Sequence, residues 1–170
     1  MLRYPVKTLL VDPSVVIPVE ESLEQEDMTI GGEAVAFLEP CQVNGLLKNI
    51  GGGIILFQGT IDMKVRMACS RCTRDTELSL QTTVEQRYIA ERQQDDIAED
   101  MEIFQNEVID LNDLVYSEIC MAIPMKVVCR EDCKGLCPIC GKDLNEGPCD
   151  CEQDTMDPRW DALKTLLQNE

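Results

Sequence analysis

The sequence predicts an α+β protein in which an antiparallel β-sheet, or meander, is covered by one or two helices and carries four-cysteine zinc-knuckle elements. Short segments of alternating apolar and polar residues between positions 33 and 88 predict the sheet. Two segments with helical periodicity predict the helices. Eight of the ten cysteines are spaced like metal ligands. We expect residues 1–128 to form the sheet domain and residues 129–170 a cysteine-rich zinc-binding segment with a helix packed on it.

The first part of the chain is the least regular. The apolar run Val6 to Val11 predicts a strand, and the acidic run Glu20 to Asp27 predicts a solvated loop. Glu33 to Glu39 and Gln42 to Leu47 predict two short strands. The three glycines 51–53 mark a flexible turn before the next strand.

The clearest strand pattern lies between residues 61 and 85. Apolar residues at every second position predict one buried face: Ile61, Met63, Val65 and Met67, followed by Leu78, Leu80 and Val84. The residues between them are polar, as a half-buried strand requires. The two runs therefore predict a hairpin, and Cys69-Ser70-Arg71-Cys72 lies at its tip.

The rest of the chain predicts one long loop and two helices. Residues 91–107 carry seven acids and one arginine, and they predict a mobile loop without a core-facing pattern. Asp110 can cap a helix that Pro124 ends and that covers one face of the sheet. Its apolar positions share one face: Leu111, Leu114, Val115, Ile119 and Ala122. Asp157-Pro158 starts a second helix, with an apolar stripe of Trp160, Leu163, Leu166 and Leu167.

Eight cysteines are candidate metal ligands. They are Cys69, Cys72, Cys129, Cys133, Cys137, Cys140, Cys149 and Cys151. A Cys-x-x-Cys turn lets two sulfurs converge on one ion, and the chain has no histidine, so every soft ligand is sulfur. This predicts two Zn²⁺ ions, each held by four thiolates. Cys41 and Cys120 lie in apolar surroundings and are expected to be ordinary packed thiols.

The sequence leaves the pairing of the eight open. The simplest partition gives Cys137, Cys140, Cys149 and Cys151 one ion, and the other four a second; its rival joins Cys69 and Cys72 to Cys137 and Cys140 as two knuckles of a zinc ribbon. Iron held by four thiolates is the main competitor of zinc. A disulfide framework lacks a recognisable secretory signal, and a redox dithiol lacks its usual βαβ context.

Charge points to the type of partner. There are 15 Lys and Arg against 32 Asp and Glu, a formal charge of −17, which repels phosphate backbones and suits a basic partner such as a ribosomal protein. Acidity can also serve only to keep a chain dispersed. One local basic strip, formed by Lys64, Arg66, Arg71 and Arg74, could contact RNA or an acidic partner. We favour the interpretation that these cations pair with nearby glutamates and metal-bound thiolates.

Six short strings, three of which contain cysteines, carry a family resemblance. They are Cys69-Ser70-Arg71-Cys72, Ile109-Asp110-Leu111, the run Cys133-Lys134-Gly135-Leu136-Cys137-Pro138-Ile139-Cys140-Gly141, Asp143-Leu144-Asn145, Cys149-Asp150-Cys151 and Asp157-Pro158-Arg159. From about residue 60 onward the chain resembles the YceD family of large ribosomal RNA subunit accumulation proteins, in the form with a cysteine-rich C-terminal segment. The resemblance implies a role in ribosome assembly in bacteria or plastids. Some family members keep only the hairpin cysteines, which implies that metal is not essential to the shared function.

The function predicted is therefore that of a non-catalytic, cytoplasmic ribosome-biogenesis factor that binds a ribosomal protein or a large-subunit precursor, with at most local RNA contact. We expect no membrane association and no small-molecule substrate. The alternative is an enzyme that uses the Cys-x-x-Cys motifs, either a thiol-disulfide redox protein or a metal-dependent enzyme. Four-thiolate sites leave no open position for water, and histidine, the commonest general base, is absent.

Overall fold

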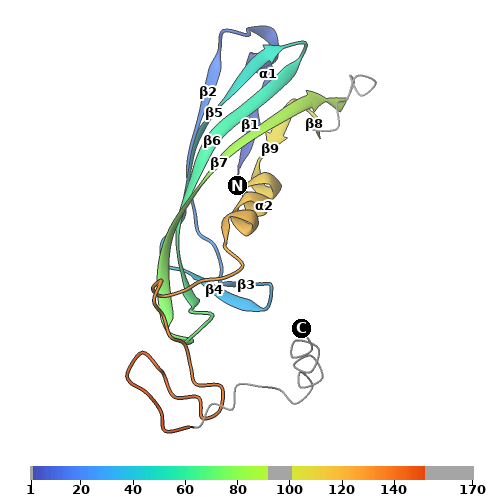
Figure 1. Ribbon diagram of the computed structural model, residues 1–170. Helices are drawn as coiled ribbons and strands as arrows, with labels where there is room; N and C mark the ends of the chain where they lie inside the picture. The colour runs from blue at the N-terminus through green and yellow to red at the C-terminus, as the bar shows by residue number, and fades with distance from the viewer. Residues whose placement is uncertain (1, 92–100, 152–170) are drawn as a thin grey trace, which may run out of the picture.

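The computed structural model describes residues 2–91 and 101–151 and contains a strongly curved antiparallel sheet with two helices in the described ranges (Figure 1). The elements in chain order are β1 (Arg3–Pro5), α1 (Lys7–Val11), β2 (Val16–Leu23), β3 (Met28–Ile30), β4 (Glu33–Phe37), β5 (Cys41–Gly51), β6 (Ile54–Ala68), β7 (Asp75–Ala90), β8 (Met101–Phe104), β9 (Val108–Asp110) and α2 (Asn112–Ala122). No helix in these ranges has the length and apolar character needed to span a membrane.

Strands β6 and β7 form a long hairpin that runs through the molecule (Figure 1). They pair from Ile54 opposite Ile89 to Ala68 opposite Asp75. The other edge of β6 is shared by two partners: β5 pairs with its first part, and β4 pairs with Val65 and Arg66 farther along. β2 extends the sheet beyond β5, and β3 pairs with β4. Towards the hairpin tip, β4 and β3 therefore take the place that β5 and β2 have at the other end of β6.

The sheet is antiparallel as predicted but is not a simple meander, because β2 pairs with β5 and β4 pairs with β6. Two short strands also depart from the antiparallel pairing. β8 pairs with β7 in parallel, from Arg87 opposite Met101 to Ala90 opposite Phe104. β9 pairs with the N-terminal strand β1 in a separate two-stranded sheet. β7 ends at Ala90 and β8 begins at Met101, so the two strands are not joined by the tight turn of an antiparallel hairpin.

The core lies on one face of the sheet. The alternation predicted for β6 is confirmed, since Ile61, Met63, Val65 and Met67 are all buried. On β7, Val84 is buried while Leu78 and Leu80 are partly buried against the same core. α2 lies on this face, as predicted, and buries Leu111, Val115 and Ile119 against it (Figure 1). The N-terminal residues Leu2, Val6 and Leu9 complete the cover.

The centre of the sheet contains a close backbone contact. Gly45 of β5 pairs directly with Gly59 of β6. A Cβ on Gly45 would lie 2.9 Å from the Cε2 atom of Phe57, and one on Gly59 would lie 3.0 Å from the Cζ atom of the same ring. Phe57 is fully buried and therefore packs its ring over two positions that have no side chain of their own. This aromatic-over-glycine arrangement requires both glycines.

Two predictions about the first thirty residues are wrong. Residues 7–11 form the helix α1 rather than a strand, because Val6 and Leu9, three positions apart, are both buried when this segment is helical. The acidic run is partly strand rather than loop. Ile17, Val19 and Leu23 alternate toward the core, and Glu21 accepts a hydrogen bond from the Tyr4 hydroxyl (3.1 Å).

Two further predictions need correction, and one cannot be compared. Residues 101–104 of the expected loop form β8, because Phe104 is buried beside β7; residues 92–100 lie outside the described ranges. Leu111, not Asp110, is the N-cap residue of α2, although Asp110 accepts a hydrogen bond from the Asn112 backbone N–H (3.0 Å). The expected helix after Asp157 also falls outside the described residues.

Candidate metal centres

The hairpin tip positions the first pair of cysteines. β6 ends at Ala68 and β7 begins at Asp75, as the sequence predicted. Between them, the backbone N–H of Cys69 donates to the Arg74 carbonyl and that of Thr73 donates to the Cys69 carbonyl, each at 2.8 Å. Thr73 has a φ of 58°, which closes the turn. Cys69 and Cys72 therefore project from a hydrogen-bonded turn.

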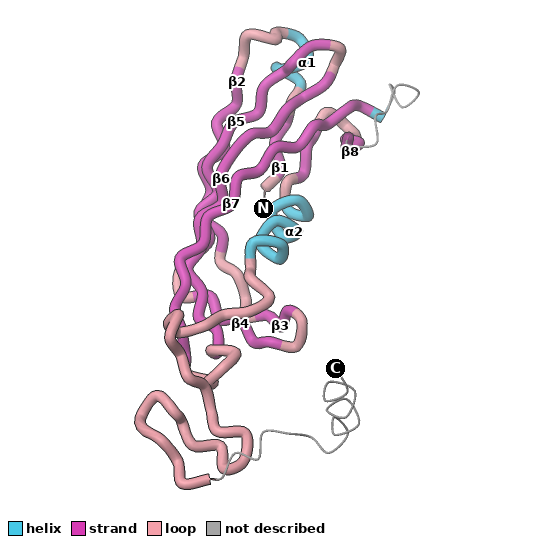
Figure 2. The backbone as a smooth tube through the Cα atoms, in the orientation of Figure 1, coloured by secondary structure: helices cyan, strands magenta, loops and turns pink. Residues whose placement is uncertain are grey.

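The segment after α2 is hydrogen-bonded to this tip by its backbone. The N–H of Ser70 donates to the Val127 carbonyl (2.8 Å), and the N–H of Leu136 donates to the Arg71 carbonyl (3.0 Å). The Arg71 guanidinium donates to the Cys133 carbonyl (2.8 Å). Figure 2 shows this segment as loop, so these contacts, rather than regular secondary structure, fix its position.

The hairpin group consists of Cys69, Cys72, Cys129 and Cys133, whose sulfur atoms all lie within 4.8 Å of one another. The sulfurs of Cys69 and Cys133 are 3.9 Å apart and those of Cys72 and Cys129 are 3.7 Å apart. A tetrahedral ion with metal–sulfur bonds of about 2.3 Å would place its sulfurs about 3.8 Å apart. The hairpin group thus has the dimensions of a closed four-thiolate site. Val128 and Leu136 pack against it.

The thiols of the hairpin group compete for ionisation. Burial opposes ionisation of Cys69, but backbone N–H donors from Cys129, Arg71 and Cys72 outweigh it and lower the pKa of Cys69 to about 6. Burial and the neighbouring thiols raise the pKa of Cys129 to about 12. Four thiolates this close repel one another unless a cation lies between them. A divalent soft cation would remove that conflict, which is how the donor set fits zinc or iron.

The distal group consists of Cys137, Cys140, Cys149 and Cys151, and its four sulfurs also lie within 4.8 Å of one another. In its Cys-x-x-Cys turn, the N–H of Cys137 donates to the Lys142 carbonyl (2.8 Å) and that of Gly141 donates to the Cys137 carbonyl (2.9 Å). The backbone N–H groups of Cys140 and Ile139 lower the pKa of Cys137 to about 6. Cys137 is buried, whereas Cys140 is exposed, so this group is the more open of the two.

Asn145, which lies in the loop between Cys140 and Cys149, bonds to the hairpin group, a role that sequence reasoning missed. Its Oδ1 atom accepts the backbone N–H of Lys134 (2.8 Å), and its Nδ2 lies 3.5 Å from the sulfur of Cys133. Asp143 holds Asn145 by accepting its backbone N–H (2.8 Å) and also pairs with Arg74 (3.1 Å). Asp143-Leu144-Asn145 was visible only as part of a family-like string, since side-chain bonding to sulfur has no spacing signature.

The cysteines come together as in the simpler of the two partitions, and the zinc-ribbon alternative does not describe this structure. All ten cysteines are free thiols. Cys41 is fully buried in the main core and Cys120 is partly buried, and neither belongs to a four-cysteine group. Metal binding by the eight candidates stays a prediction.

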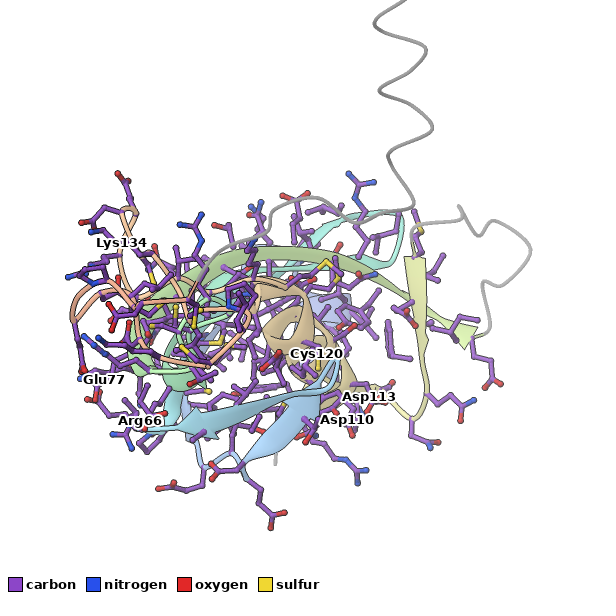
Figure 3. All side chains as sticks on the ribbon, turned by 60° about the horizontal axis from the view of Figure 1, so that its bottom comes forward. Arg66, Glu77, Asp110, Asp113, Cys120 and Lys134 are labelled. Carbon is purple, nitrogen blue, oxygen red and sulfur yellow. The ribbon has the colours of Figure 1, made fainter. Side chains whose placement is uncertain are left out.

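The basic strip has partners within the protein. Arg66 pairs with Glu77 across the hairpin (3.3 Å), and Figure 3 shows the two side chains close together. Lys64 pairs with Glu39 (3.3 Å), and Arg74 pairs with Asp143. Arg71 donates to backbone carbonyls beside the hairpin group. These contacts agree with the interpretation that the cations pair with acidic side chains of this protein. RNA contact by the strip stays a prediction.

Replacing Gly135 by alanine is expected to weaken the hairpin group. Gly135 has a φ of +75°, and a Cβ there would lie 2.9 Å from the Arg71 carbonyl oxygen. Gly141→Ala is the matched control, because Gly141 has a φ of +74° but no atom within 4 Å of its Cβ position. The backbone strain alone should cost about 1–2 kcal/mol in both variants. Chemical unfolding should show a larger loss for Gly135→Ala; equal losses would contradict the close contact.

Fold and site together define an acidic α+β protein with a long β-hairpin and two four-cysteine groups suited to a soft metal ion, one at the hairpin tip and one in the loop that follows. The chain belongs to the YceD family, the large ribosomal RNA subunit accumulation proteins, which matches residues 57–167. The matched region includes all eight candidate ligands.

The curated relatives share moderate identity with this chain. The uncharacterised protein YlbN of Bacillus subtilis is 27% identical over 152 residues, covering 89% of this chain and 88% of the relative. An uncharacterised protein of Mycobacterium tuberculosis is 29% identical over 116 residues, covering 66% of this chain but only 56% of the relative. No solved structure shows a significant match.

Proposed function

We propose that this protein is a non-catalytic ribosome-biogenesis factor that promotes the accumulation of large-subunit ribosomal RNA. It acts by binding a basic ribosomal protein or a pre-ribosomal particle in the cytoplasm. The observation that carries this proposal is membership of the YceD family, which is named for large ribosomal RNA subunit accumulation. The matched region spans both the long hairpin and the cysteine groups, so the proposal concerns most of the folded protein.

Charge supports a protein as the direct partner. The chain carries 32 acidic against 15 basic residues, and such a field repels a phosphate backbone. Each cation of the basic strip already contacts a carboxylate or a backbone carbonyl of this protein. RNA binding by the strip would have to replace those contacts, so it is the weaker candidate within this proposal.

The eight cysteines are proposed to hold two zinc ions with a structural role. Cys69, Cys72, Cys129 and Cys133 would close the hairpin tip onto the segment after α2, and the other four would order the loop that follows. Zinc supplies the positive charge that four converging thiols need. Elemental analysis of the purified protein should find two zinc ions per chain. Two iron ions per chain would replace zinc in this proposal. A purified protein that contains no zinc and no iron would contradict it.

Deleting the gene for this protein in its native cell tests the proposed function. We expect the ratio of large-subunit to small-subunit ribosomal RNA to fall, and a plasmid copy of the intact chain to restore it. The tagged chain should also co-sediment with large-subunit precursors rather than with mature ribosomes. An unchanged RNA ratio in the deletion strain, with no precursor association, would overturn the proposal.

A further inference from the structure

A groove with a volume of about 1130 Å³ opens between β8, β9 and α2. Tyr88 of β7 lines it from the sheet, and Leu114 and Ser117 line it from α2. β8 and β9 follow one another through a tight turn in which Asn106 and Glu107 have positive φ. They share only an isolated bridge between Gln105 and Val108, so the space beyond that bridge is left open between them.

The groove is strongly acidic. Its charged lining comprises four carboxylates and one guanidinium: Glu102, Asp110, Asp113, Glu118 and Arg3. Arg3 forms an ion pair with Asp110, since its Nε atom lies 2.7 Å from a carboxylate oxygen of that residue. Within residues 2–91 and 101–151, no ion-pair partner occupies Glu102, Asp113 or Glu118. Figure 3 shows Asp110 and Asp113 close together where α2 begins.

A buried phenol lies at the inner side of the groove. Tyr88 is only 4% exposed and lines the groove, yet its hydroxyl has no hydrogen-bond partner among the residues described. Among the residues described, every fully buried side-chain nitrogen or oxygen atom has a hydrogen-bond partner. The Tyr88 hydroxyl has none among these residues, so it is not fully buried and is the part of Tyr88 that is accessible from the groove. Burial raises its pKa, and the charges of Glu102 and Asp110 add to that effect. The hydroxyl therefore stays neutral, with a free acceptor site beside two carboxylates.

Within the part of the chain that the structure describes, β8 also has one unpaired edge. β8 pairs with β7 along one edge only, and the structure pairs no second strand with it in the described ranges. Such an edge presents unpaired backbone N–H and C=O groups that an extended peptide can use. The groove thus combines fixed negative charge, an unused hydrogen-bond acceptor and an available strand edge.

We propose that this groove binds an extended basic segment of a protein partner. A lysine or arginine side chain of that segment donates to the Tyr88 hydroxyl oxygen between Glu102 and Asp110, and further cations face Asp113 and Glu118. The inference rests on the proposed function, because it gives the basic partner of that function a place to bind. A nucleic acid does not suit the groove, since its phosphates would face four carboxylates.

A labelled peptide of about ten residues that alternates lysine and threonine is the probe for this inference. Its binding to the full chain can be followed by fluorescence anisotropy. Removing three unpaired groove charges, with Glu102→Gln, Asp113→Asn and Glu118→Gln together, should weaken binding about tenfold or more. The matched control changes three exposed acids elsewhere, with Glu20→Gln, Glu24→Gln and Glu33→Gln, and should weaken binding less than about twofold.

Tyr88→Phe removes only the hydroxyl and should weaken peptide binding about threefold to tenfold, whereas Tyr116→Phe on the exposed side of α2 should leave it unchanged. Three results would overturn the inference. They are no peptide binding, equal weakening by the two charge triples, and tighter binding of a poly-uridine strand of similar length than of the peptide.

The deletion strain separates this inference from the proposed function. If the intact chain restores large-subunit RNA but the groove triple does not, both stand. If the groove triple restores it as well as the intact chain does, the groove is not the partner site and the inference fails while the proposed function stands. If the deletion leaves the RNA ratio unchanged, the proposed function fails, and the peptide measurements alone then decide whether the groove binds basic segments.

Discussion

Replacing Cys133 by serine is expected to reduce the zinc content from two ions per chain to one and to lower Tm by roughly 10 °C. Cys133 is buried, its sulfur lies 3.9 Å from that of Cys69, and its carbonyl accepts from Arg71. A serine hydroxyl cannot replace a thiolate as a zinc ligand of equal affinity. Losing the ion would leave the segment around Val127 attached to the hairpin tip by hydrogen bonds alone.

Two control variants make this result specific. Cys120→Ser removes a thiol outside both groups and should keep both ions. Cys140→Ser should also lose one ion, but with a smaller change in Tm, because the distal group lies beyond the sheet and is more exposed (Figure 1). Metal content by mass spectrometry and thermal unfolding by circular dichroism provide the measurements. Retention of two ions by Cys133→Ser would rule out the hairpin group as a metal site.

Replacing Phe57 by alanine is expected to destabilise the protein by about 3–5 kcal/mol, the usual cost of deleting a fully buried aromatic ring. The ring covers Gly45 and Gly59, which have no side chains to fill the space it would leave. Tyr116→Ala, which removes a ring that is 55% exposed, should cost under about 1 kcal/mol. Urea unfolding followed by circular dichroism gives both values.

A double-mutant cycle tests the contact itself. Gly45→Ala alone should cost about 1–3 kcal/mol, because its new methyl group meets the Phe57 ring and the neighbouring backbone. In the Phe57→Ala background the ring is gone, so the same glycine substitution should cost less. The coupling between the two sites should exceed about 0.5 kcal/mol. Strictly additive costs would show that the ring does not lie over Gly45.

Much of the sheet could be predicted because its strands carry a local signal. Residues such as Ile61 and Val65 alternate with polar neighbours, and the two runs around Cys69 and Cys72 predict a hairpin with those cysteines at its tip. The same reasoning failed where charge hid the alternation. Glu20 and Glu21 looked like a solvated run, yet Glu21 faces inward and its carboxylate is satisfied by Tyr4, a partner 17 residues away.

The remaining features depend on contacts between distant segments. β8 is a strand because Phe104 finds a buried place beside Ala90, which no short sequence window can reveal. The cysteine spacing identified the eight candidate ligands but not their grouping. The grouping follows from the docking of residues 127–136 on the hairpin tip, through bonds such as that from Leu136 to Arg71. The contact of Asn145 with Cys133 and the acidic groove had no sequence signal, because each brings together residues from separate segments of the chain.

The hairpin group joins residues that are far apart in sequence, with Cys72 and Cys129 separated by 57 positions and Cys69 and Cys133 by 64. The distal group lies entirely within residues 137–151. Closing a short loop costs less chain entropy than closing a long one, and pairing of β6 with β7 brings Cys69 and Cys72 together before the distant cysteines arrive. In the zinc-bound protein that we propose, the distal ion therefore depends on local chain closure. The hairpin ion depends on the tertiary fold, so loss of that ion would be the more sensitive indicator of an unfolded sheet.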